Sequence, residues 1–391
     1  MTFSVLWRSF SIRAVAIPMT AILLLGSGAC GNRSAQPEQT VEDSKPEPEV
    51  ENRLTFNDIT LEQVDGEGNL MWVVNGKQAT YSGDRQLAAV ETPKAELYQN
   101  GELVFQIEAL QGEVHQNGEK IVLREEVVAV DTQDGAVMTG DELEWLPKDD
   151  TLIVRGNLTG THERADVTAE EVQLFSQQRR LEAFGAVVMR VKESSLQVST
   201  EQIVWEMEPE QVFIEQQVQV DRFEIEGEGE EEEEKITDRA VADRGTLDLA
   251  AQVATLQDNA QLSLVEPPLQ VASNELIWDL PGEVVTSNVP VKVVHEEEQV
   301  TMTGNQGWVT LAEKMFYLSN GIEALGKDNL AQLIAENLTW DISAQEFVAQ
   351  GNVTYRQVDP PFNLTGPKAE GKLESQTFVI SGGRVVTEII P

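Results

Sequence analysis

A short pattern recurs about every thirty residues over most of the chain, and this repeat constrains the fold more than any other feature. In each copy a small residue is followed, three or four positions later, by an apolar residue, and the sharpest copies add an aromatic residue two positions further on. Such units are expected to stack on one another. The copies begin at Ala79, Ala109, Thr139, Thr168, Thr200, Ala242, Ala272, Thr303, Ala335 and Ala369.

Apolar residues alternate with polar ones inside each unit, as in Leu103, Phe105 and Ile107. A period of two indicates strands with one wet face. Two such strands per unit are not stable alone, so the units must stack into two facing sheets. We therefore predict an all-β fold, an elongated antiparallel β-jellyroll or folded-over β-sandwich with about ten two-strand repeats and a continuous apolar interior.

Glycine and asparagine mark two kinds of position in the repeats. Turn signals that supply residues with positive φ occur at Gln99-Asn100-Gly101, Gln116-Asn117-Gly118, Asp134-Gly135 and Ser381-Gly382-Gly383, and we expect hairpin turns there. Other glycines precede apolar residues, in Gly156-Asn-Leu158, Gly185-Ala-Val187 and Gly351-Asn-Val353. We expect these to open the second strand of a unit.

One unit is longer than the others because it contains EIEGEGEEEEEK between Glu224 and Lys235. Glutamates in such a run repel one another and predict a solvated loop at 224–235. A calcium site is the alternative, but the run lacks the Asp-x-Asp spacing of a coordinating loop.

The charge balance excludes some classes of function. The chain has 67 acidic and 28 basic side chains, three His and one Cys. The acidic excess argues against nucleic acid as a partner, because such binding depends on Lys and Arg. No residues suggest a metal site, a cofactor or a catalytic centre, so we predict that the protein is not an enzyme. The run Gly321–Asp328 has phosphate-loop spacing but no magnesium-binding hydroxyl.

The N-terminus has the pattern of an export signal or membrane anchor at residues 1–29. Arg8 and Arg13 precede an apolar run that ends at Ala29. Ser27-Gly28-Ala29-Cys30 is similar to a bacterial lipobox, which predicts lipidation of Cys30. An uncleaved helix and a buried structural Cys are the alternatives. Residues 30–52 are rich in Ser, Pro, Gln and Glu and are expected to form a disordered acidic tether.

Several motifs resemble the LptC family of bacterial lipopolysaccharide export, which shares an OstA-like fold. The resemblance is strong over residues 54–191 and looser to the C-terminus, as in an extended, cyanobacterial-type member. We expect a first segment at 53–198 and a second at 199–391 that continues the same jellyroll. The motifs are Asp65-Gly66 with Trp72, Ala79 with Tyr81, Pro93 with Leu97-Tyr98, Ala109 with Gly112, Thr139 with Leu143 and Trp145, and Gly185-Ala-Val187.

The resemblance implies a periplasmic protein, anchored to the inner membrane, that passes lipopolysaccharide toward the outer membrane. Its partners would be lipopolysaccharide, the permease subunits of an inner-membrane ABC transporter, and a downstream OstA-like jellyroll or outer-membrane assembly. A structural surface lipoprotein without lipid cargo, or a carrier of another lipid, are the alternatives.

The repeat positions together supply candidates for a lipid groove, although for any single Trp filling the core is the favoured interpretation. A C-terminal edge with little protection against strand addition is the candidate docking site for a partner. The segment from Leu54 to Val64 is the opposite edge. The groove candidates are Leu143, Trp145, Ile203, Trp205, Leu276, Trp278, Trp308, Leu338 and Trp340, and the edge candidates are Phe378, Ile380, Val385 and Ile389.

Overall fold

A computed structural model describes residues 54–115, 118–227, 233–266, 268–327, 330–358, 361–372 and 377–389. Met1–Val50 and Glu51–Pro391 form separate units, and every described residue belongs to the second. The export signal, Cys30 and the tether lie outside the described residues. Within the described ranges the chain forms strands and turns only, and no helix is long and apolar enough to cross a membrane.

The strands follow one another along the chain with short connections. The first fourteen are β1 (Leu54–Val64), β2 (Leu70–Tyr81), β3 (Leu87–Glu91), β4 (Lys94–Gln99), β5 (Glu102–Glu108), β6 (Gln111–His115), β7 (Ile121–Asp131), β8 (Val137–Leu146), β9 (Thr151–Thr161), β10 (Ala165–Phe175), β11 (Arg180–Val191), β12 (Leu196–Glu206), β13 (Gln211–Ile214) and β14 (Val218–Glu226). The remainder are β15 (Glu233–Ala242), β16 (Arg244–Asp248), β17 (Val253–Leu264), β18 (Leu269–Asp279), β19 (Val284–Ser287), β20 (Val291–His295), β21 (Val300–Gly304), β22 (Gln306–Thr310), β23 (Met315–Gly326), β24 (Ala331–Asp341), β25 (Glu346–Gln357), β26 (Phe362–Lys372), β27 (Thr377–Ser381) and β28 (Val386–Ile389).

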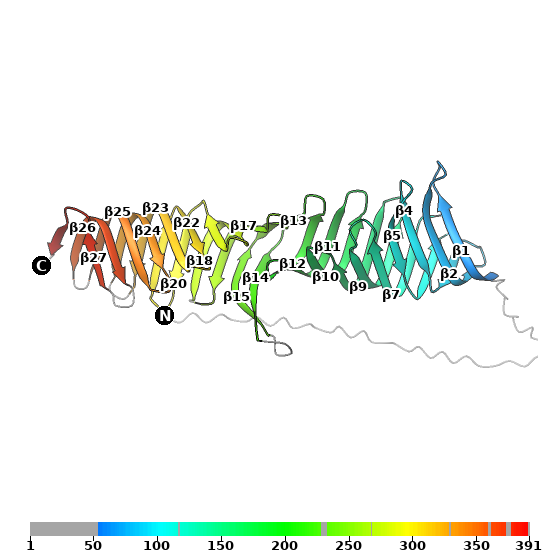
Figure 1. The fold of residues 1–391 in the computed structure, drawn as a ribbon, viewed down its shortest axis with the longest axis horizontal. Coiled ribbons are helices and arrows are strands. Elements are labelled where there is room, and N and C mark those ends of the chain that lie inside the picture. Colours follow the sequence, from blue (N-terminus) through cyan, green and yellow to red (C-terminus); the bar gives the residue numbers. More distant parts are fainter. Residues whose placement is uncertain are drawn as a thin grey trace, which may run out of the picture. The chain divides into compact units, whose positions relative to one another are not determined.

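The 28 strands of the described ranges belong to one hydrogen-bonded sheet, and every pairing among them is antiparallel. Figure 1 shows the strands as a long row from β1 at the blue end to β27 near the red end. The prediction of an elongated all-β, jellyroll-like structure is confirmed. Strand β12 crosses the expected 198/199 boundary and pairs with β11 on one side and with β13 and β14 on the other.

Most long strands bend near their middle, where the pairing register shifts. Gly156 and Asn157 have φ values of +74° and +46° inside β9, and Gly351 and Asn352 have +83° and +48° inside β25. A bulge of this kind bends the strand and increases its twist. The expectation that these glycines open new strands is therefore wrong, because each lies within one continuous strand.

In other places the strand is interrupted at the bend. For example, β13 and β14 pair with the two halves of β12, and β27 and β28 pair with the two halves of β26. The segment Ser381–Gly383 is thus a bend between two half-strands, and the expectation of a hairpin turn there is wrong. The expected turns at Asn100-Gly101 and Asp134-Gly135 do join hairpins, whereas Gln116-Asn117 lies outside the described residues.

The half-strands on the two sides of the bends bury their apolar faces in a single core that extends from Leu61 to Ala369. Strand β18 illustrates the alternation, since Leu276 and Trp278 are each 2% exposed while Glu275 and Ile277 face outward and are half-buried. Burial of apolar surface along the whole row is the main term that stabilises it.

The acidic run is more ordered than expected. Glu224 pairs in register with Lys235, and Ile225 with Glu234, so both flanks belong to the hairpin of β14 and β15. Arg190 of β11 donates a hydrogen bond to Glu234 at 2.7 Å, although β11 does not pair with β15. The expectation of a loop over the whole of 224–235 is wrong for its described parts. Figure 1 shows this hairpin projecting beyond its neighbours.

Candidate functional site

The repeat positions predicted from the sequence line the core at regular intervals. Leu143 and Ile203 have no exposed surface, and Leu276 and Leu338 are 2% and 3% exposed. The Trp residues two positions later are also buried, at 4% for Trp145, 2% for Trp205, 2% for Trp278 and 1% for Trp340. Each pair thus contributes one apolar layer to the interior.

Trp308 does not belong to these layers. Its side chain is 39% exposed and stacks on Tyr317 on the outer face, with ring centroids 4.8 Å apart. The neighbouring Val309 is 1% exposed and takes the inward position of β22. The expectation that Trp308 lines the interior is wrong, because alternation at period two turns it to the opposite face.

Four interior indole groups are hydrogen-bond donors without a partner. The buried Nε1 atoms of Trp72, Trp145, Trp205 and Trp340 make no hydrogen bond in the described structure. A buried unpaired donor costs free energy that an acceptor in the interior would recover. These tryptophans are spread along the row, so the interior is not purely apolar.

The interior is closed on one side by contacts between strand ends. The eleven residues of β7 would span about 36 Å if they were straight. Arg179 lies in the turn that follows β10, and Asp131 is the last residue of β7. Yet Arg179 donates a hydrogen bond to Asp131 at 2.6 Å. The half-strands on the two sides of the bends must therefore fold face to face. The turns at opposite ends of the strands then meet along a line that we call the seam.

We name the two sets of turns that meet along this seam the first lip and the second lip. The first lip comprises residues 65–69, 99–101, 131–136, 161–165, 191–196, the ends of β14 and β15, 264–266, 268–269, 295–300, 326–327 and 330–331. The second lip comprises residues 82–86, 115, 118–121, 146–151, 175–180, 206–211, 248–253, 279–284, 310–315 and 341–346.

Contacts across the seam follow a rule. In the five hydrogen-bonded pairs, the first-lip turn meets not the next second-lip turn along the chain but the one after it, so the partners are separated by 46 to 61 residues. The hydrogen-bonded pairs are Gln99 with Asp150 at 3.3 Å, Arg179 with Asp131 at 2.6 Å, Arg164 with Glu210 at 3.2 Å, Gln252 with Glu193 at 2.8 Å, and Arg222 with Glu283 at 2.9 Å.

Two histidines of the first lip make ring contacts with tryptophans at strand ends next to the second lip. His162 packs edge-on against Trp205 with centroids 5.1 Å apart, and His295 lies against Trp340 at 5.6 Å. His295 is only 1% exposed. No group of His, Cys, Asp or Glu in the described part of the chain is arranged to hold a metal ion.

The seam contacts are electrostatically favourable although partly buried. Burial lowers the pKa of Arg179, but hydrogen bonds and charges from Asp131 and Asp134 outweigh it and raise the pKa above its usual value. The hydrogen bond to Glu210 raises the pKa of Arg164 in the same way. These guanidinium groups stay charged, and charge-assisted bonds of this kind are stronger than neutral ones.

The C-terminal edge candidates are only partly described. Val385 is 41% exposed, whereas Ile380 is half-buried and packs against the core. The side chains of Phe378 and Ile389 lie outside the described residues. Strands β27 and β28 each pair with β26 alone among the described strands, as β1 pairs with β2 alone.

Comparison with known proteins adds one relation. Residues 19–182 match the family described as lipopolysaccharide-assembly, LptC-related. A search among curated proteins gave no match. The matched range includes the layer of Leu143 and Trp145 and the Arg179 seam contact, whereas the layers of Ile203, Leu276 and Leu338 continue the same architecture beyond it.

Proposed function

We propose that this LptC-related protein is a membrane-anchored periplasmic component of the lipopolysaccharide transport bridge and passes acyl chains along its interior. The family relation supports a role in lipopolysaccharide transport in general. The interior route, the anchor and the partners are our inference from the sequence and the geometry.

The observation that carries the proposal is the continuity of the core. One buried cluster extends from Leu61 to Ala369, with equivalent uncharged layers at Leu143, Ile203, Leu276 and Leu338. A chain that moves from one such layer to the next exchanges one apolar environment for another. Exposing it to water instead would cost about 0.8 kcal/mol per CH₂ group.

The unpaired indole donors of Trp72, Trp145, Trp205 and Trp340 suit the same cargo. The acyl chains of lipopolysaccharide are joined through ester and amide carbonyls, which accept hydrogen bonds. Entry of chains requires the core side chains to give way, and the seam provides the flexible boundary because it is closed by side chains and not by a backbone ladder. The described residues supply no motor, so direction would come from an ATP-driven transporter.

The partners are inferred from the two ends of the sheet. Edge strands expose unpaired backbone groups that accept another strand. The β1 edge would face the permease subunits of the inner-membrane ABC transporter, and the β27–β28 edge would face the next jellyroll of the bridge or the outer-membrane assembly. Anchoring would come from a lipid on Cys30 or from an N-terminal helix.

Leu276→Asp in cells that depend on this protein tests the interior route. An unpaired carboxylate in an apolar layer should block passage of acyl chains, so outer-membrane lipopolysaccharide should fall even where the variant is folded and abundant. Ile277→Asp, one position away on the outer face, is the matched control. Normal export with a folded Leu276→Asp protein would contradict the route and favour a structural scaffold; loss of another lipid instead would favour a different cargo.

A further inference from the structure

The seam has one position at which the expected contact is replaced by a cavity. By the rule of the other contacts, the first-lip turn with Val265 and Glu266 should meet the second-lip turn with Leu311 and Lys314. In the described parts of these turns no hydrogen bond or ion pair joins them. Both turns instead line a cavity of about 310 Å³.

The cavity opens directly onto core residues. Val309 and Ile342 are 1% and 2% exposed, and Leu264 and Leu311 are 9% and 7% exposed, yet all four line it. Its volume is at the lower end of the roughly 300–1,000 Å³ typical of small-molecule sites. At this point residues of the apolar core therefore form part of the cavity wall.

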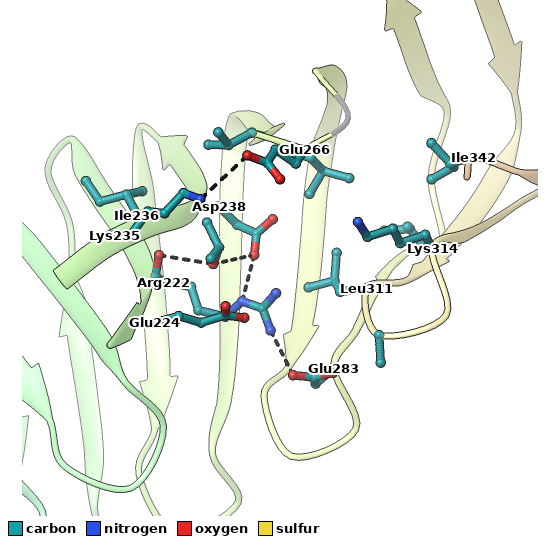
Figure 2. Close-up of a pocket in the computed structure, with 15 residues that line it drawn as sticks. Arg222, Glu224, Lys235, Ile236, Asp238, Glu266, Glu283, Leu311, Lys314 and Ile342 are labelled. Atoms are coloured by element: carbon teal, nitrogen blue, oxygen red, sulfur yellow. Dashed lines mark hydrogen bonds and ion pairs between the residues drawn. The ribbon is translucent and has the colours of Figure 1, made fainter. Parts of the chain in front are cut away.

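Charged groups surround the opening, as Figure 2 shows. Arg222 is held by Asp238 at 2.6 Å and by Glu283 at 2.9 Å, so its charge is balanced. Glu266 turns back to Lys235 on its own lip, at 3.6 Å, instead of crossing the seam.

Lys314 differs from the other two basic groups at the opening. Its ammonium group forms no ion pair with the described residues, and in Figure 2 it faces the cavity from the second lip. A positive charge above an apolar floor suits a ligand with an anionic head and an alkyl chain.

We propose that this cavity is a lateral portal of the interior that takes the alkyl chain of an anionic amphiphile, with the head group held by Lys314. The proposal rests on the proposed function, because it assumes that the interior accepts such chains. The Arg222–Glu283 contact is the last closed contact before the portal on the β14–β15 side, and the His295–Trp340 contact closes the seam beyond it.

The test measures binding of cis-parinaric acid, a fluorescent fatty acid, to the purified full chain. Ala312 is exposed in the second-lip turn and lines the cavity, so Ala312→Trp should fill the opening without disturbing the core. Ala251→Trp, in an equivalent exposed turn that does not line the cavity, is the matched control. We expect Ala312→Trp to weaken binding about tenfold, as when about two methylene groups lose their burial.

A second variant tests the head group. Lys314→Gln should weaken binding of the acid but not of its uncharged methyl ester. Equal affinities for the wild type, Ala312→Trp and Ala251→Trp, or no binding of the acid by the wild type, would overturn the portal. The interior route is tested separately by lipopolysaccharide capture at Leu143, in a layer that does not line this cavity, so the two proposals can fail independently.

Discussion

Arg179 lies in the turn between β10 and β11, 48 residues from Asp131 at the end of β7, yet Arg179 Nη1 donates to Asp131 Oδ2 at 2.6 Å. Asp131 is 2% exposed, so its carboxylate has little access to water. The pair closes the seam by joining the two halves of the folded sheet.

Replacing Arg179 with Gln should leave the Asp131 carboxylate buried without its ionic partner. Loss of one member of a buried pair typically costs about 3–5 kcal/mol. We expect a clear fall in the urea midpoint of unfolding of the purified protein, followed by circular dichroism. Arg244→Gln is the control, because it removes an ion pair to Asp258 whose side chains are 47% and 46% exposed, and should cost at most about 1 kcal/mol. Equal effects of the two substitutions would mean that the seam contact contributes no more than a surface pair.

The bend in β9 should not tolerate a side chain at its glycine. At Gly156, φ is +74° and an added Cβ would lie 2.5 Å from Asp141 Oδ2, the same atom to which Asn157 donates at 2.7 Å. Gly156→Ala should therefore destabilise the fold by about 1–3 kcal/mol. Gly83→Ala, in an open turn with nothing within 4 Å, should be close to neutral. Similar melting temperatures for the two variants would show that the bend tolerates a side chain.

The layers of the core could be predicted from the sequence because period-two alternation is local. Leu276 and Trp278 face inward for the same reason that Glu275 faces outward. At Trp308 the prediction of an interior position followed the aromatic residue of the repeat. Alternation instead gives the inward position to its neighbour Val309. The glycines were recognised as special, but a sequence does not distinguish a bend inside a strand from the start of one.

The seam was not predictable in this way. Arg222 and Glu283 are 61 residues apart, and no local pattern links them. Their pairing depends on how far the twisted halves are offset, which is a property of the whole row. The cavity beside them was even less predictable from the sequence, because it is recognised only where the series of seam contacts is interrupted.

Acid should weaken the outer-face cluster around Arg155. Burial raises the pKa values of Glu144 and Glu171, but the hydrogen bonds and charges of their partners, including Arg155, outweigh it and lower both below the usual 4.5. Stability from lowered carboxyl pKa values is present above about 4.5 and is lost as the pH falls through the folded-state values. Arg155→Met should cost about 1 kcal/mol at neutral pH, because its side chain is 38% exposed.

The difference between the wild type and Arg155→Met should then shrink as the pH is lowered toward about 3, in urea titrations at each pH. Lys94→Met is the control, since Lys94 and Glu108 are 68% and 65% exposed and should show little difference at any pH. A stability difference between the wild type and Arg155→Met that grows in acid would contradict this prediction.

The C-terminal edge should be needed for binding to the next bridge protein. Val379 in β27 is 65% exposed, and Val379→Lys places a charge on a strand edge, which disfavours strand addition. Deletion of 377–391 and Val379→Lys should both reduce capture of the downstream jellyroll in pull-down assays, while circular dichroism shows the remainder folded. Binding that survives the deletion would rule out this edge.

Site-specific photocrosslinking from the interior tests the central claim most directly. A photoreactive residue at Leu143 or Leu276, each at most 2% exposed, should capture lipopolysaccharide when the inner-membrane transporter and ATP are present. The same residue at Glu144 or Glu275, the outward neighbours, should not. Capture at the inward positions alone is the result we predict; equal capture at both sets, or at neither, would contradict passage of acyl chains through this interior.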